Sequence, residues 1–163
     1  MNIGIIVYSQ TGNTFSIAQR LKDRLGAQGH AVALERLATI GEVRRGSTDV
    51  RFEKLPDTAR YDVLVFASPV EGMALSPVMK GYFKQVGYLA NKRVALLVTE
   101  YFPWPWLGGN QAVGYMKKEC EAKGAVVCGW GVVNWSNSRR EQQATGLVER
   151  LTALLTEGHS SDG

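Results

Sequence analysis

The sequence has little of what builds disulfide frameworks or metal centres. Its 163 residues include only two cysteines and two histidines. Cys120 falls on an apolar helical stripe and Cys128 in an apolar strand pattern, so we expect two reduced core thiols and no disulfide. Their spacing, with His30 and His159 included, matches no metal-ligand pattern. We therefore expect no metal site and a reducing, cytoplasmic location.

Long apolar runs are also absent. The longest have the length of a strand, so we expect no insertion into a membrane. The first apolar run has no basic region before it and no small-residue cleavage site after it, which argues against a signal peptide. The net charge of +4 is mild. The basic residues form no stripe with interleaved aromatics, so we expect no nucleic-acid binding. Either the partner or substrate is acidic, or the charge balance has no specific meaning.

Five strand-length apolar segments alternate with helical patterns along the chain. The strands are expected at residues 3–8, 31–37, 61–67, 93–98 and 125–133. Helices are expected after the first, third, fourth and fifth of them, whereas residues 39–60 lack periodicity and suggest an irregular crossover. This order predicts an α/β fold with a parallel sheet. We expect one domain over residues 1–158 and a short disordered tail over 159–163.

Three sequence signals predict where helices begin. Ser76 is expected to cap a helix that has Pro77 at its first position. Asn110 is a candidate cap for the next helix. Ser138 and Glu141 have the spacing of a capping box, which predicts the start of the last helix.

A hydroxyl-rich turn, Ser9-Gln10-Thr11-Gly12-Asn13-Thr14, joins the first strand to the first helix. A turn there gathers backbone N–H groups that lack intrahelical partners, at the positive end of the helix dipole. Such a place binds phosphate without a basic residue, and the turn contains none. Gly12 permits close approach of the backbone, and we expect the hydroxyl of Thr14 to meet the phosphate. A capped turn that binds nothing would not need so many polar groups.

This turn, followed by Ala18 and Leu21, resembles the phosphate loop of the flavodoxins, which bind the terminal phosphate of FMN. Val7 departs from the pattern, because many members carry an aromatic residue there. The resemblance implies a flavodoxin-like fold: a doubly wound five-stranded parallel sheet of order 2-1-3-4-5. FMN would bind at its switch point.

The resemblance also implies that the segments after the third and fourth strands contact FMN. After the third strand, Ser68 could reach the ribityl chain, and Pro69 and Val70 could pack on the ring. In flavodoxins a flexible peptide here contacts the flavin N5 and reorients on reduction. We assign Glu71-Gly72 to that role, since glycine tolerates a positive φ.

The segment after the fourth strand is rich in aromatic residues. The residues expected to contact FMN there are Thr99, Glu100, Tyr101, Phe102, Trp104 and Gly108. Tyr101 and Trp104 are the candidates for stacking on the ring, and the sequence does not choose between them. Alternatively, Trp104 or Trp106 protrudes to contact a partner protein.

Arg139 and Arg140 occupy the predicted first turn of the last helix, where the helix dipole disfavours cations. One of them could face an anionic substrate, the phosphate of a nicotinamide cofactor or an acidic partner. A solvated pair without a ligand is an equally open interpretation.

Three other classes of α/β domain do not match the sequence. The first turn has only Gly12 where a dinucleotide fingerprint needs three glycines, and no Walker motif occurs. A response-regulator domain would need acidic residues where Ser9, Gln10 and Ser68 stand. We expect an FMN protein that carries electrons between partner proteins, with no catalytic side chain. The alternatives are an NAD(P)H-dependent FMN or quinone reductase that uses a small-molecule acceptor, and a binding module with little or no flavin.

Overall fold

A computed structural model describes residues 1–44, 46–47, 49–101 and 108–157 of the protein. The predicted tail over 159–163 lies outside these residues, as do Phe102, Trp104 and Trp106. Within the described ranges, no helix is both long enough and apolar enough to cross a bilayer.

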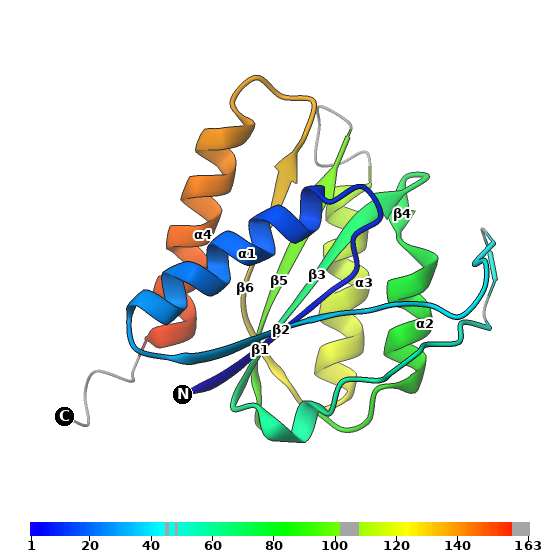
Figure 1. The fold of residues 1–163 in the computed structure, drawn as a ribbon, viewed down its shortest axis with the longest axis horizontal. Helices are drawn as coiled ribbons and strands as arrows, with labels where there is room; N and C mark the ends of the chain where they lie inside the picture. Colours follow the sequence, from blue (N-terminus) through cyan, green and yellow to red (C-terminus); the bar gives the residue numbers. More distant parts are fainter. Residues whose placement is uncertain (45, 48, 102–107, 158–163) are drawn as a thin grey trace.

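The fold is built on a parallel sheet of order β2-β1-β3-β5-β6, to which a short antiparallel strand is added (Figure 1). The strands are β1 (Asn2–Val7), β2 (Ala31–Arg36), β3 (Val63–Glu71), β4 (Ala74–Leu75), β5 (Arg93–Glu100) and β6 (Val126–Asn134). Among the described residues, β4 pairs with β3 alone. The five parallel strands have the predicted 2-1-3-4-5 order, which confirms the fold class.

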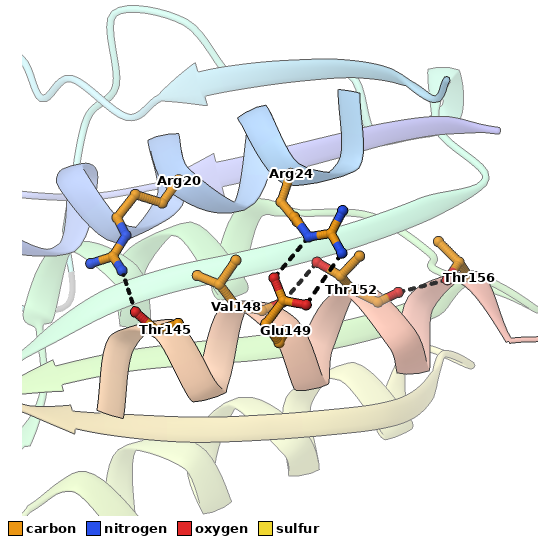
Figure 2. Close-up of polar contacts among 7 residues, drawn as sticks. All are labelled: Arg20, Arg24, Thr145, Val148, Glu149, Thr152 and Thr156. Atoms are coloured by element: carbon orange, nitrogen blue, oxygen red, sulfur yellow. Dashed lines mark hydrogen bonds and ion pairs between the residues drawn. The ribbon is translucent and has the colours of Figure 1, made fainter. Parts of the chain in front are cut away.

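Within the described residues, four α-helices cover the two faces of the sheet (Figure 1). They are α1 (Asn13–Ala27), α2 (Pro77–Gln85), α3 (Gly109–Ala122) and α4 (Arg140–Thr156). One core packs α1 and α4 against one face of the sheet, and a second packs α2 and α3 against the other. Polar bonds also join α1 to α4: Arg20 donates to Thr145 at 2.8 Å, and Arg24 pairs with Glu149 at 2.7 Å (Figure 2).

The crossover from β2 to β3 is irregular, as predicted. Its described residues contain no α-helix, only one bridge between Thr39 and Phe52 and a 3₁₀ turn, η1 (Thr58–Arg60). The crossover packs on α2 at Val50, because a Cβ on Gly81 would lie 2.4 Å from a Val50 methyl. Gln85 adds a 2.6 Å hydrogen bond to the Val50 carbonyl.

β3 is longer than the sequence predicted. Residues 68–71, expected as a loop, continue the strand, because Ser68 and Pro69 lie beside Val98 and Thr99 of β5. Val70 and Glu71 pair with β4. The missing N–H of Pro69 is tolerated near the strand end.

One of the three predicted helix caps is confirmed. The Ser76 hydroxyl accepts a hydrogen bond from the Val78 N–H at 3.3 Å. Asn110 is not a cap, because α3 begins at Gly109 with Gly108 before it. The predicted capping box of Ser138 is wrong as well. There the Asn137 side chain accepts from the Arg139 N–H at 2.8 Å, and α4 begins only at Arg140, without a side-chain cap.

Candidate functional site

A cleft of about 190 Å³ lies where the parallel strands end. It is lined by Gln10, Thr11, Asn13, Pro69, Val70, Glu71, Thr99, Glu100, Tyr101 and Trp135. All of these except Trp135 belong to the predicted site. Parallel strands bring their carboxyl ends to one edge of a sheet, which is where ligands bind in open α/β folds. The other described residues of the predicted site, Ser9, Gly12, Thr14, Ser68, Gly72 and Gly108, adjoin the lining residues in sequence or support them.

The hydroxyl-rich turn is held in shape by Ser9. Its buried Oγ accepts hydrogen bonds from the N–H groups of Gly12 at 3.1 Å and Phe15 at 3.2 Å. Gly12 has φ 92°, a left-handed conformation that glycine adopts without strain. The turn therefore closes on itself and directs the first turn of α1 toward the sheet edge.

Several amides of this turn have no acceptor among the residues that the structure describes. No described residue takes a hydrogen bond from the N–H of Thr11, Asn13 or Thr14. Asn13 and Thr14 begin α1, where no intrahelical carbonyl can serve them. Three open donors at the positive end of a 15-residue helix form a site suited to an anion.

The hydroxyl of Thr14 already has a partner. It lies 2.6 Å from the Thr99 hydroxyl, and both residues are buried. This bond ties the start of α1 to the end of β5. Thr14 therefore has a structural contact that the sequence did not predict, while its amide remains open.

A basic side chain reaches the turn from β2. Arg36 donates a 2.8 Å hydrogen bond to the Ser9 carbonyl, and its guanidinium lies 4.9 Å from the centre of the Phe15 ring. Sequence analysis missed this residue because it lies outside the turn. The signal was the parallel pairing of β1 with β2, which sets Val7 beside Arg36.

The β3–β4 hairpin forms the next wall of the cleft. Its two turn residues, Gly72 and Met73, have φ 58° and φ 67°, as in a type I′ turn. Before them, the Oε1 atom of Glu71 is buried and has no hydrogen-bond partner among the described residues. Gly108 packs on the hairpin, since a Cβ there would lie 2.8 Å from a Val70 methyl.

Glu100 is a buried carboxylate at the end of β5. Only 3% of it is exposed, and its Oε2 accepts a 2.9 Å hydrogen bond from the Gly109 N–H. Burial raises the pKa of Glu100, and the bond from Gly109 partly offsets this. A Cβ on Gly109 would lie 3.0 Å from the Glu100 Oε1, so the glycine makes room for the carboxylate.

Two aromatic residues stand at the cleft, one of them unforeseen. Tyr101 is 72% exposed. Trp135 lines the cleft just after β6, and its backbone N–H donates to the Glu100 backbone carbonyl at 2.7 Å. Arg140 donates to the Trp135 carbonyl at 3.1 Å, and its guanidinium lies 5.1 Å from the ring centre. No sequence motif predicted a ligand role for Trp135.

The sheet order, the two helical layers and the position of the cleft define a flavodoxin-like α/β protein. Solved structures agree. A flavodoxin of Streptococcus pneumoniae TIGR4 superposes with a TM-score of 0.69 at 17% identity, over 94% of this chain and 99% of that chain. A flavoprotein in complex with FMN from Lactobacillus acidophilus NCFM gives 0.61 at 14%, over 88% and 98%. The azoreductase AzrA gives 0.67 at 14%, over 96% and 100%.

These similarities establish the flavodoxin-like fold of the chain. No protein-family model matches the sequence, and the search of curated proteins gave no match.

Proposed function

We propose that this protein binds FMN and transfers electrons, as a redox carrier between partner proteins. The observation that carries the proposal is the set of open amides at Thr11, Asn13 and Thr14, beside a cleft at the carboxyl edge of a flavodoxin-like sheet. An anionic group with an adjoining planar ring matches both features.

The residues present fit FMN. The terminal phosphate would take the three open amides, with Arg36 adding positive charge beside the turn. The ring would lie near Tyr101 and Trp135. The L. acidophilus protein with this fold is in complex with FMN, which supports the choice of cofactor.

The protein would bind and orient the cofactor, and FMN when bound supplies the redox chemistry. The Glu71-Gly72 peptide keeps its proposed role of reorienting near N5, because a glycine at φ 58° can change conformation at small cost. Ser68, Pro69, Val70 and Gly108 would support this wall. Phe102 and Trp104 lie outside the described residues, so their contacts stay a prediction.

A titration of the purified protein with FMN, followed by quenching of flavin fluorescence, tests the proposal. Gly12→Ala should weaken binding about ten-fold, since a side chain at φ 92° forces the turn to change. Gly26→Ala, within the helix that follows the turn, is the matched control. It lies in open space and has no positive φ, so it should leave the affinity unchanged. Equal affinities for both variants would refute the assigned phosphate position.

An NAD(P)H-dependent FMN or quinone reductase is the second candidate. The observation that favours it is Arg140, whose guanidinium covers the Trp135 ring at the cleft wall and could attract an anionic substrate. The fold similarity to the azoreductase AzrA supports it too. Oxidation of NADH or NADPH by the FMN-loaded protein alone, in the presence of a quinone, would favour the enzyme. No oxidation without an added protein partner would favour the carrier.

The third candidate, a binding module without flavin, would be favoured if the wild-type protein took up no FMN in the same titration. In the proposed role the redox partners are acidic proteins or a small-molecule acceptor, in keeping with the net charge of +4. The proposal includes a single FMN-binding domain over residues 1–158. It also includes a cytoplasmic location, where the free thiols of Cys120 and Cys128 would stay reduced.

A further inference from the structure

A second hollow lies on the α2 side of the β3–β4 hairpin. Its volume is about 450 Å³, within the range of about 300–1,000 Å³ typical of small-molecule pockets. Lys80 and Lys84 of α2, Tyr115 of α3, and Glu71 and Leu75 of the hairpin strands contribute to its lining. Glu71 borders both this hollow and the cleft.

The α2 wall of the hollow is fixed by tight packing. Gly81, which also lines the hollow, has no room for a Cβ against Val50. The 2.6 Å bond from Gln85 to the Val50 carbonyl holds the crossover in place. The hollow is thus bounded by packed elements on this side.

Two cations without an acidic partner face the same space. Lys80 and Lys84 are one helical turn apart, and neither forms an ion pair with a described residue. Like charges at this spacing disfavour the helix unless an anion lies between them. The Lys80 Nζ lies 5.3 Å from the centre of the Tyr115 ring, so a cation and an aromatic wall occur together.

The opposite wall is apolar with one buried acceptor. Leu75 is 2% exposed, and the buried Glu71 Oε1 has no donor among the described residues. A fitting ligand has an anionic group for the two lysines, a flat apolar ring for Tyr115 and Leu75, and a hydrogen-bond donor for Glu71. We propose that this hollow is a nucleotide-binding site, distinct from the cleft.

Calorimetric titration with adenosine monophosphate tests this site. We expect Lys80→Gln/Lys84→Gln to weaken binding about ten-fold relative to the wild type. The matched control, Lys54→Gln/Lys118→Gln, removes the same charge from exposed positions and should bind like the wild type. Ala74→Phe, which fills the hollow and keeps both lysines, should also weaken binding. Inorganic phosphate alone should bind more weakly than the nucleotide.

The same titration in the Gly12→Ala background separates the two sites. Binding that survives Gly12→Ala and is lost with the two lysines assigns the nucleotide to the hollow, whether or not FMN binds the cleft. The proposal is overturned if the wild type binds no nucleotide at millimolar concentration. It is also overturned if the control loses as much affinity as the lysine variant, or if only Gly12→Ala abolishes binding.

Discussion

The starts of α1 and α3 are built alike and used differently. Each helix begins at the carboxyl edge of the sheet behind a glycine with positive φ, Gly12 at 92° and Gly108 at 135°. Neither preceding residue caps the helix with a side chain. At α3, however, the protein supplies its own anion, because the Glu100 carboxylate accepts from the Gly109 N–H. At α1 the amides of Asn13 and Thr14 have no acceptor in the described part of the chain.

The comparison shows two outcomes for similar helix starts: the protein fills the donors of one with its own carboxylate and leaves donors of the other open among the described residues. Both ends have the same dipole and the same kind of N–H groups. At the start of α3, the nearly fully buried carboxylate of Glu100 accepts a backbone N–H. At the start of α1, the Ser9 hydroxyl accepts from the amides of Gly12 and Phe15 and leaves the two amides between them without a bond from it.

The largest effect on stability is expected from a substitution at the start of α3. Gly109→Ala places a Cβ 2.8 Å from a Val132 methyl and 3.0 Å from the Glu100 Oε1, which should lower the free energy of unfolding by about 2–3 kcal/mol through overpacking. Gly12→Ala has open space around it, so only its positive φ should cost stability, about 1 kcal/mol. Urea unfolding measures both. A larger loss for Gly12→Ala would contradict the packing argument.

Thr14→Val should lower the free energy of unfolding by about 1–2 kcal/mol, because the buried Thr99 hydroxyl loses its partner. Thr152→Val is the matched control. Thr152 is equally buried, but its hydroxyl donates to the Val148 carbonyl of its own helix (Figure 2). That carbonyl still accepts a backbone hydrogen bond of the helix when the hydroxyl is removed. Its replacement should change stability by less than about 0.5 kcal/mol. Thermal unfolding of the two variants side by side would reveal a similar loss if the Thr14–Thr99 bond contributed nothing.

Glu100→Gln sharpens the comparison through pH. Burial raises the folded-state pKa of Glu100 above its ordinary value of 4.5. A group of this kind contributes stability that is complete below its unfolded pKa and lost as pH rises through the folded pKa. The free energy of unfolding of the wild type minus that of Glu100→Gln should therefore grow as pH falls from neutrality toward 4.5. A difference that stays constant in urea titrations across this window would argue against a raised pKa.

The smallest expected effect is on the α1 side. Arg36→Gln removes a partly exposed hydrogen bond to the turn and should weaken FMN binding by about 0.5 kcal/mol, or roughly two-fold. Arg24→Gln removes the same charge from the far part of α1, where Arg24 pairs with Glu149 (Figure 2). It should leave FMN affinity unchanged in fluorescence titrations. An equal effect of both changes would mean that only net charge matters.

Much of the fold and part of the site could be predicted because their signals are local. The turn from Ser9 to Thr14 shows its polar groups in six consecutive residues, and Ser76-Pro77 marks a helix start by itself. Arg36 and Trp135 could not be assigned in this way, since only the sheet order brings their strand ends to the cleft.

Two local signals were overridden by neighbours that the sequence does not reveal. Asn137 competes with Ser138 for the start of α4 and provides the turn bond to Arg139. The apolar run predicted that β3 ends at residue 67, yet pairing with β5 and β4 extends that strand to Glu71. Pairing across the sheet decided the local conformation in this second case.

The bond between Thr14 and Thr99 also bears on how the protein folds. The two residues are 85 positions apart in the chain, so the turn meets its support only after a long loop has closed. Closing such a loop costs chain entropy before the contact can repay it. We therefore expect α1 to form first and the turn at its start to reach its final geometry only when β5 joins the sheet. Binding of an anion at this turn would then require a completed sheet.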